Sequence, residues 1–220
     1  MKIGDKNLSI LKSLVSINDS MLIEKDSDAF VISPCGSVIG YAALSPHFEN
    51  DLSIYDMKQF LGVTSLFDDP DLVFASDGKS ITIGNDSQKV KYFLTDKSFV
   101  NKGKKLTMPD DSEVFFTLTS EIIDKVTKAS DVLGLKYISI SSVGTDINIG
   151  ACEVDDDTAN KYTEKVADGN GTMFNFHWKA SKVKFISVDY EVTCSSQNIA
   201  EFKGEGVVYW VGMETSSSYG

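Results

Sequence analysis

The feature that most constrains the fold is the spacing of its apolar residues, which passes through the same order of helix-like and strand-like patterns twice along the chain. In each half, a stretch with helical spacing is followed by runs that alternate every second residue, then by a second helix-like stretch and further strands. Landmarks correspond between the halves, Leu11 with Ile123 and Gly36 with Gly144, although residue identity is poor. The pattern therefore predicts two similar α+β domains, each with two helices packed on antiparallel sheet.

The predicted first half begins with a helix and ends with a hairpin and one more strand. Helical spacing predicts helices at residues 7–17 and 57–67, and Asp56 is placed to cap the second one. Asp77-Gly78 is typical of a tight hairpin turn, because glycine tolerates positive φ. Short apolar or alternating runs predict strands at residues 21–24, 29–33, 38–44, 52–55, 72–75, 80–83 and 89–94.

The predicted second half repeats this order. A helix is expected at residues 120–133 with Ser120 as its N-cap, and a shorter one at residues 180–186. The buried stripe of the longer helix is expected to consist of Ile122, Val126, Ala129 and Leu133. Strands are predicted at residues 114–118, 136–141, 147–153, 161–166, 173–178, 190–194, 199–203 and 207–213, and residues 215–220 form a polar tail that we expect to be frayed.

Residues 97–111 have the composition of a connector. They are rich in lysine and include Pro109 followed by Asp110 and Asp111, between the last strand of one half and the first strand of the next. The predicted domains are therefore residues 1–109 and 110–220, with the connector at about residues 97–111.

Composition excludes several classes of site. All 21 basic residues are lysine, so no site can use the bidentate fork of an arginine guanidinium. The two histidines and three scattered cysteines argue against a structural zinc site and against a disulfide framework. No nucleotide-binding or hydrolase motif occurs. We therefore expect no cofactor, no metal and no enzymatic activity.

The remaining reactive side chains favour structural roles. The aspartates at residues 68–71 and Asp155-Asp156-Asp157 predict solvated turns. His177 alternates away from the aromatic face of its strand, which predicts a surface imidazole. Cys152 and Cys194 lie in apolar strands and are expected to be small core residues.

The charge of the chain is unevenly distributed. The net charge is −11, yet the predicted helices and their first flanking turns hold eight lysines against five acidic residues. An acidic protein with positive helices repels nucleic acid with one surface and tolerates it on another. Charge alone does not separate this interpretation from an ordinary solvated helix face.

Four segments, in order, resemble the sliding clamps of T-even-type bacteriophages. They are LKSLVSIN from Leu11, LSIYDMKQFLGVTSL from Leu52, TMFNF from Thr172, and EFKGE from Glu201 followed by Tyr209. The resemblance extends over the whole chain and is poorest across residues 86–114 and 155–169.

The resemblance implies a DNA-clamp fold. Three chains would close head to tail into a ring whose helices line a hole around duplex DNA. Such a ring tethers the phage DNA polymerase to its template, is opened by an ATP-driven clamp loader, and in T-even phages also activates late transcription. On this basis the expected DNA-facing residues are Lys12, Lys58, Lys125, Lys128, Lys182 and Lys184.

The resemblance also implies a groove beside the connector that accepts a short hydrophobic peptide, often the C-terminus of the polymerase. The expected groove residues are Tyr41, Leu106, Met108, Pro109 and Val211. The apolar connector residues could instead pack against the domain seam as ordinary core.

Two other functional classes stay open. One is a structural or adaptor β-rich phage protein, and the other is an enzyme whose site combines His177 with Asp155–Asp157. The chain shows no signal-peptide pattern, and its longest strongly apolar run, residues 207–213, is too short to span a bilayer. We therefore expect a location in the host cell cytoplasm.

Overall fold

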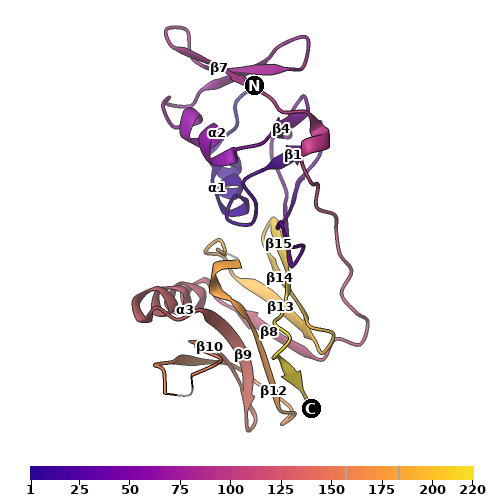
Figure 1. Ribbon diagram of the computed structural model, residues 1–220, viewed down its shortest axis with the longest axis vertical. Helices are drawn as coiled ribbons and strands as arrows, with labels where there is room; N and C mark the ends of the chain where they lie inside the picture. The colour runs from indigo at the N-terminus through magenta and orange to yellow at the C-terminus, as the bar shows by residue number, and fades with distance from the viewer. Residues whose placement is uncertain (157, 183) are drawn as a thin grey trace. The chain divides into compact units, whose positions relative to one another are not determined.

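The computed structural model describes residues 1–156, 158–182 and 184–220, and the chain divides into two compact units (Figure 1). They are Met1–Lys105 and Leu106–Gly220, so the division falls inside the predicted connector. Each unit combines helices with antiparallel strands, which confirms the predicted α+β class. Within the described ranges, no helix is both long and apolar enough to cross a membrane.

The first unit contains two α-helices and seven strands among its described residues. In chain order they are α1 (Asp5–Leu14), β1 (Met21–Ile23), β2 (Ala29–Ile32), β3 (Val38–Ala42), β4 (Leu52–Ile54), α2 (Met57–Thr64), β5 (Asp71–Phe74), β6 (Ser80–Gly84) and β7 (Lys89–Phe93), followed by a 3-10 turn, η1 (Lys97–Phe99). Strands β1 and β4 pair, β2 pairs with β3, and β5-β6-β7 form a three-stranded sheet.

Both helices of the first unit pack by one face. Met57, Phe60 and Leu61 of α2 are buried, and α2 lies against β6. Asp56 caps α2 as predicted, since its carboxylate accepts a hydrogen bond from the Gln59 amide at 2.8 Å. Helix α1 approaches β3 closely at Gly40, where a Cβ would lie 2.7 Å from a methyl of Leu14. Each helix therefore covers one face of its neighbouring strands and leaves the polar side of the helix exposed.

In the three-stranded sheet β5-β6-β7, only one of the two edge strands pairs with another segment of the unit. The N-terminus runs along β5, where the Leu72 amide donates to the Met1 carbonyl and the Met1 amino group donates to the Leu72 carbonyl. Strand β7 has no such neighbour in the described part of the first unit. Its edge is therefore free to pair with another strand.

The second unit contains one α-helix and nine strands among its described residues. They are β8 (Val114–Leu118), α3 (Ser120–Leu133), β9 (Tyr137–Val143), β10 (Asp146–Cys152), β11 (Tyr162–Asp168), β12 (Phe174–Lys179), η2 (Ala180–Lys182, a 3-10 turn), β13 (Tyr190–Ser195), β14 (Ile199–Gly204), β15 (Val207–Gly212) and β16 (Ser218–Tyr219). One sheet has the order β11-β10-β9-β12-β16, and in another the strands of this unit run β15-β14-β13-β8.

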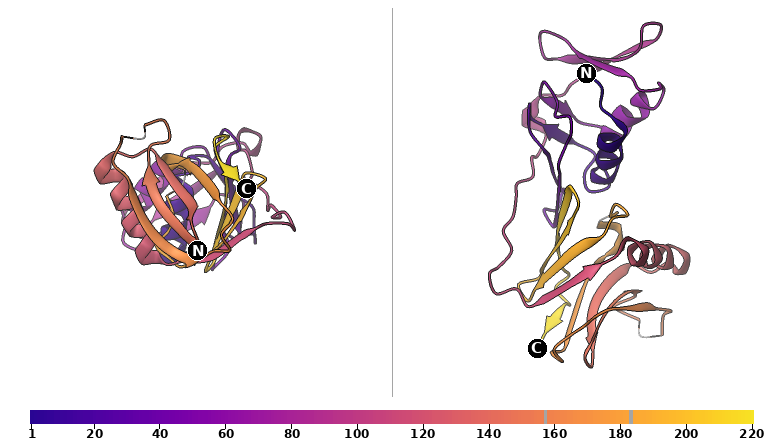
Figure 2. Two further views of the ribbon diagram at one scale, coloured as in Figure 1. Left: turned by 90° about the horizontal axis from the view of Figure 1, so that it is seen from below. Right: turned by 180° about the vertical axis from the view of Figure 1, so that it is seen from behind.

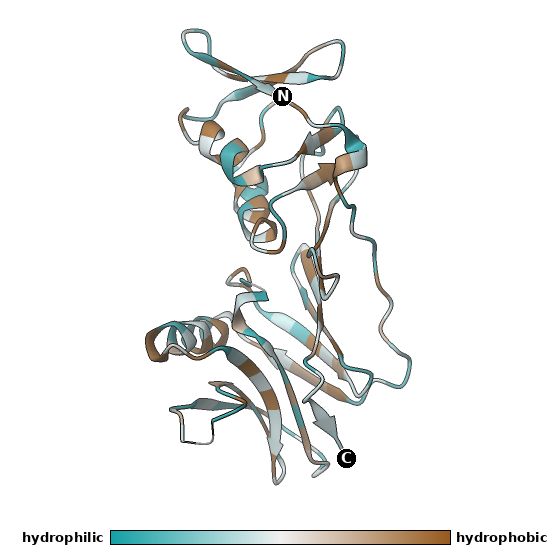
Figure 3. Ribbon diagram, in the orientation of Figure 1, coloured by the Kyte–Doolittle hydropathy of each residue, from teal (hydrophilic) through white to brown (hydrophobic). Residues whose placement is uncertain are grey.

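The core of the second unit is formed by both of its sheets together with α3 and is rich in aromatic side chains. Trp178 packs edge-on against Phe202, with ring centroids 5.4 Å apart, and both are buried. Apolar and polar residues alternate along β9, which Figure 3 shows as alternating colours. Helix α3 lies against β9, β10 and β11, as both views in Figure 2 show. The five-stranded sheet thus has one face under the helix.

Four local predictions for the second unit are wrong. The N-cap of α3 is Thr119, whose hydroxyl accepts a hydrogen bond from the Ile122 amide, and Ser120 is the first residue of the helix. The helix expected at residues 180–186 is a single 3-10 turn over Ala180–Lys182, without helix at 184–186, and Val183 lies outside the described residues. The tail is not frayed throughout, because Ser218 and Tyr219 pair with β12 as β16. The buried face of α3 consists of Ile123, Val126 and Ser130, and Leu133 is 42% exposed.

Two glycines provide a test of this packing. Alanine at Gly150 would place its Cβ 2.3 Å from the Tyr162 carbonyl oxygen on β11, whereas Gly62 in α2 has nothing within 4 Å. We expect Gly150→Ala to destabilise the fold by ~1–3 kcal/mol through backbone displacement. Gly62→Ala should stabilise it by up to about 1 kcal/mol, because alanine loses less entropy in a helix. Thermal unfolding of both variants checks this, and a loss of stability in Gly62→Ala would contradict it.

Candidate nucleic-acid interface

Four of the six predicted DNA-facing lysines lie on α-helices and are exposed. Lys12 is in the last turn of α1, Lys58 in the first turn of α2, and Lys125 and Lys128 in the middle of α3. On α3 both lysines lie outside the buried face formed by Ile123 and neighbouring residues. Ammonium groups on such exposed faces can reach phosphates without directional hydrogen bonding.

Two of these four lysines already have acidic partners. The Lys58 ammonium lies 2.8 Å from a carboxylate oxygen of Asp19. The Lys125 ammonium lies 2.8 Å from Glu121, one turn earlier on α3, and 3.4 Å from Glu164 on β11. The hydrogen bond with Glu121 raises the pKa of Lys125. Each of these two ammonium groups therefore has a carboxylate within ion-pair distance.

Lys12 and Lys128 differ from this pair. Neither takes part in an ion pair within the ranges that the structure describes, and both side chains are exposed. They therefore carry uncompensated positive charge on α1 and α3.

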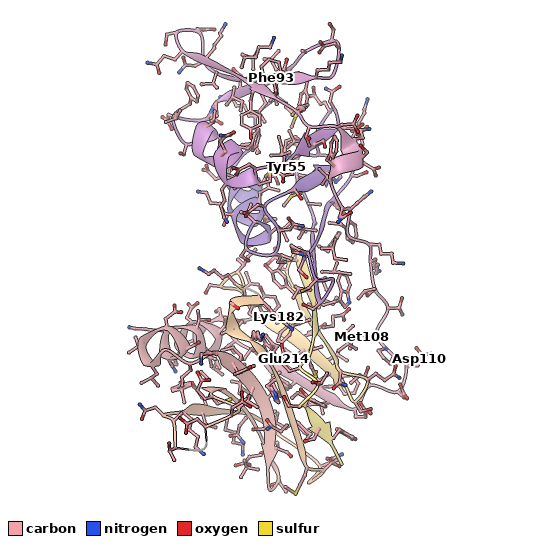
Figure 4. The ribbon with its side chains drawn as sticks, viewed as in Figure 1. Tyr55, Phe93, Met108, Asp110, Lys182 and Glu214 are labelled. Atoms are coloured by element: carbon pink, nitrogen blue, oxygen red, sulfur yellow. The ribbon has the colours of Figure 1, made fainter. Side chains whose placement is uncertain are left out.

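Lys182 is the least available of the predicted lysines. Its ammonium lies 2.7 Å from Glu214 and 3.4 Å from the carbonyl oxygen of Gly212, and only 19% of its side chain is exposed. Figure 4 shows the Lys182 and Glu214 side chains close together. The hydrogen bond with Lys182 lowers the pKa of Glu214. Lys182 thus ties the segment after β15 to η2, while Lys184, two residues on, is exposed.

The predicted groove residues occupy several environments. In the second unit Leu106, Met108 and Pro109 are half-buried on the connector, on which Figure 4 marks Met108. Val211 on β15 is fully buried, so its side chain is not itself exposed to a ligand. In the first unit Tyr41 on β3 is half-buried.

The Tyr41 hydroxyl is held by a small polar cluster of the first unit. It donates a 2.8 Å hydrogen bond to Asp28, whose other carboxylate oxygen lies 3.0 Å from Nε2 of His47. The ring of Tyr41 also packs against Phe30, with centroids 5.0 Å apart. The orientation of Tyr41 is therefore determined within its own unit.

No family model matches the chain. Among curated proteins, however, it is similar from end to end to three proteins named sliding clamp. The clamp of Vibrio phage KVP40 is 26% identical over 220 residues, covering 97% of this chain and 99% of the relative. The clamps of Escherichia phage RB69 and Enterobacteria phage T4 are 27% and 25% identical, covering 100% of this chain and 99% of each relative. From end to end, then, the chain is similar to the sliding clamps of T4-type phages, and this similarity supports a DNA sliding clamp.

Solved structures agree on the fold of this clamp. A. fulgidus PCNA, determined with the C-terminal region of FEN-1 bound, matches with a TM-score of 0.68 at 14% identity and covers 96% of both chains. The proliferating cellular nuclear antigen of Entamoeba histolytica matches with a TM-score of 0.66 at 14% identity and covers 94% of both chains. The predicted DNA-clamp fold is therefore confirmed.

His177 of the clamp is not the surface imidazole that the alternation predicted. It is 1% exposed, because the segment after β15 covers it: Nε2 hydrogen-bonds to the Ser216 hydroxyl, and Tyr137 packs edge-on against the ring. Its Nδ1 has no hydrogen-bond partner among the described residues. Burial lowers the pKa of His177, with Glu214 and Asp155 acting in the opposite direction.

These contacts do not form a catalytic arrangement. The Ser216–His177 pair lacks a third group to orient the imidazole, because Nδ1 is unpartnered in the described structure. Asp156 accepts hydrogen bonds from Thr158 in a turn, and Asp157 lies outside the described residues. The described residues also include no group of three or more histidine, cysteine or carboxylate side chains placed to hold a metal. Cys194 is buried as predicted, whereas Cys152 is half-buried.

Sequence reasoning missed the acidic partners of the lysines. Asp19 follows α1, Glu164 lies on β11 and Glu214 follows β15, so all three come from outside the helix whose lysine they pair with. Only Glu121 was detectable, since it precedes Lys125 by four residues on one helix.

The buried imidazole predicts a pH dependence of stability. Burial holds the pKa of His177 in the folded protein below the unfolded value of about 6.5. The stability that the neutral imidazole contributes is therefore fully present above about pH 6.5, and it is lost as the pH falls from there through the folded pKa. We expect the wild-type free energy of unfolding to fall between pH 7.5 and 5.5 more steeply than that of His177→Gln. Urea titrations at both pH values measure the difference, and identical slopes would show that His177 titrates normally.

Proposed function

We propose that three copies of this chain close into a ring around duplex DNA and hold the phage replicative DNA polymerase on its template. The observation that carries the proposal is the end-to-end similarity to three phage sliding clamps, which leaves almost no part of either protein unmatched. Sliding clamps are processivity factors without catalytic activity of their own. The chain would act in the host cell cytoplasm, be loaded by an ATP-driven clamp loader, and also take part in late transcription.

Two edge strands support ring closure. Strand β7 of the first unit and β11 of the second each end a sheet without a further strand beside them in the described part of their own unit. Phe93 on β7 is 70% exposed, and Lys91 lies 5.1 Å from the centre of its ring (Phe93 is marked in Figure 4). Pairing β7 of one copy with β11 of the next gives a heterologous contact, which closes only as a ring.

The edge pairing predicts that charge on β7 affects assembly. Strand β7 carries Lys89 and Lys91, whereas β11 carries Glu164, Lys165 and Asp168. Reversing both β7 lysines to glutamate should weaken each interface by ~1–2 kcal/mol, because it adds negative charge to an edge that would pair with a strand carrying two acids and one lysine. Sedimentation should show a trimer for the wild type and smaller species for the variant at equal concentration.

The control is Lys203→Glu, which makes the same kind of charge change on β14, a strand of the second unit that has β13 on one side and β15 on the other and so has no free edge. It should leave the trimer intact. Loader-dependent retention on nicked circular DNA tests the function itself: the wild type should stay on circles and leave once the DNA is cut. A wild-type monomer, or retention unaffected by linearisation, would contradict the proposal.

Weak DNA contact suits a ring that must slide. Topology, rather than affinity, keeps a closed ring on DNA, and a net charge of −11 keeps non-specific affinity low outside the helices. Lysine contacts phosphates as a mobile point charge, so it does not lock the ring in one register. Among the predicted residues, Lys12 and Lys128 provide the uncompensated charge.

Partner proteins are proposed to dock a hydrophobic C-terminal peptide on the connector. Half-buried Leu106, Met108 and Pro109 supply an adaptable apolar surface there. Val211 of the same unit is buried and is proposed as support, whereas Tyr41 is included on the resemblance alone. The FEN-1 segment bound to A. fulgidus PCNA gives an example of a C-terminal region on a protein of this fold.

Met108→Glu should weaken binding of the cognate polymerase's C-terminal peptide by ~1–3 kcal/mol, since it places a charge against an apolar anchor. Isothermal titration measures the change. Met173→Glu is the matched control, because Met173 is 73% exposed on the same unit and outside the connector. Equal affinities for the wild type and Met108→Glu, with the fold intact, would place the peptide elsewhere.

A further inference from the structure

The helix lysines of this clamp fall into two classes that differ in their immediate electrostatic surroundings. Lys58 and Lys125 each have a carboxylate at 2.8 Å, from Asp19 and Glu121 respectively. Lys12 and Lys128 have no ion-pair partner in the ranges that the structure describes. All four ammonium groups are on exposed helix faces, so burial does not explain the difference.

A carboxylate beside an ammonium reduces what that ammonium offers to a phosphate. A phosphate that approaches Lys58 meets a nearly neutral pair, and it must either displace Asp19 or remain close to its negative charge. The pair is exposed, with 67% of the Lys58 and 52% of the Asp19 side chain accessible, so exchange is easy. The contact to DNA is therefore weakened without being blocked.

We propose that Asp19 and Glu121 are counter-charge residues that limit the affinity of the helix lysines for DNA, and so keep the ring mobile on it. This inference rests on the proposed function. Neither acid contacts DNA in this scheme; each acts through its lysine. Asp19 also accepts the Met57 amide through its backbone carbonyl at 2.7 Å, which places it beside the first turn of α2, where Lys58 lies.

The two acids should differ in strength. Lys58 has Asp19 as its only ion-pair partner among the described residues, whereas Lys125 keeps Glu164 at 3.4 Å when Glu121 is neutralised. Removal of the Asp19 charge therefore frees a full positive charge, and removal of the Glu121 charge frees only part of one.

The test is a double-mutant cycle on DNA affinity. Binding of the assembled clamp to a short fluorescent duplex is measured against salt concentration for wild type, Asp19→Asn, Lys58→Gln and the double variant. We expect Asp19→Asn to bind about two- to fivefold more tightly at low salt and to steepen the log–log salt slope by up to about one unit. In the Lys58→Gln background the same substitution should have little effect.

Asp131→Asn is the matched control, because Asp131 is exposed on α3 and has no ion pair in the described structure. It changes the net charge equally but frees no lysine, so its effect should be clearly smaller. Glu121→Gln should lie between the two. Equal gains for Asp19→Asn and Asp131→Asn, or a gain that persists without Lys58, would overturn the inference. If the wild type is still retained on circular DNA, such results would overturn this inference and leave the proposed function standing. If the wild type is not retained, the proposed function itself would be overturned.

Discussion

One-sided burial of the sheets is the constraint on which the rest of this structure depends. The strands carry apolar residues on the face that helices and aromatic side chains cover, and polar residues on the other. Each helix in turn buries one stripe, such as Ile123, Val126 and Ser130 of α3, and leaves the opposite side exposed. In each unit the helices therefore present a polar outer surface, and Lys12, Lys58, Lys125 and Lys128 lie on these surfaces.

The same arrangement leaves edges and charges for assembly and DNA contact. Strand β5 is capped by the N-terminal residues, while β7 and β11 are open within their own units. On the helices, positive charge is present but partly matched by Asp19, Glu121 and Glu164. A ring that encircles DNA and slides along it needs both properties. Its subunits must bind one another through surfaces that do not contact the DNA, and the attraction of its helices to the DNA must be weak.

Prediction from sequence succeeded where a signal is local. The N-cap Asp56 and the 14-residue helix α3 follow from residues within one turn of each other, and most strands begin and end within two residues of their expected bounds. It failed where the outcome depends on a distant segment. The alternation of side chains along β12 placed His177 on the polar face of that strand. It could not show that residues near Ser216 cover this face. Similarly, Ser218 and Tyr219 are ordered because β12 offers them an edge.

The sequence by itself determined the two α+β units, their order of elements, the absence of arginine and the placement of lysines on helices, because period and composition are properties of short stretches. Only the tertiary structure decided which lysines are electrostatically free. Asp19, Glu164 and Glu214 lie outside the helices that carry their partners, and an ion pair depends on distances of about 3 Å, which spacing along the chain does not encode. The effective charge of this clamp's helices is therefore a product of its folding.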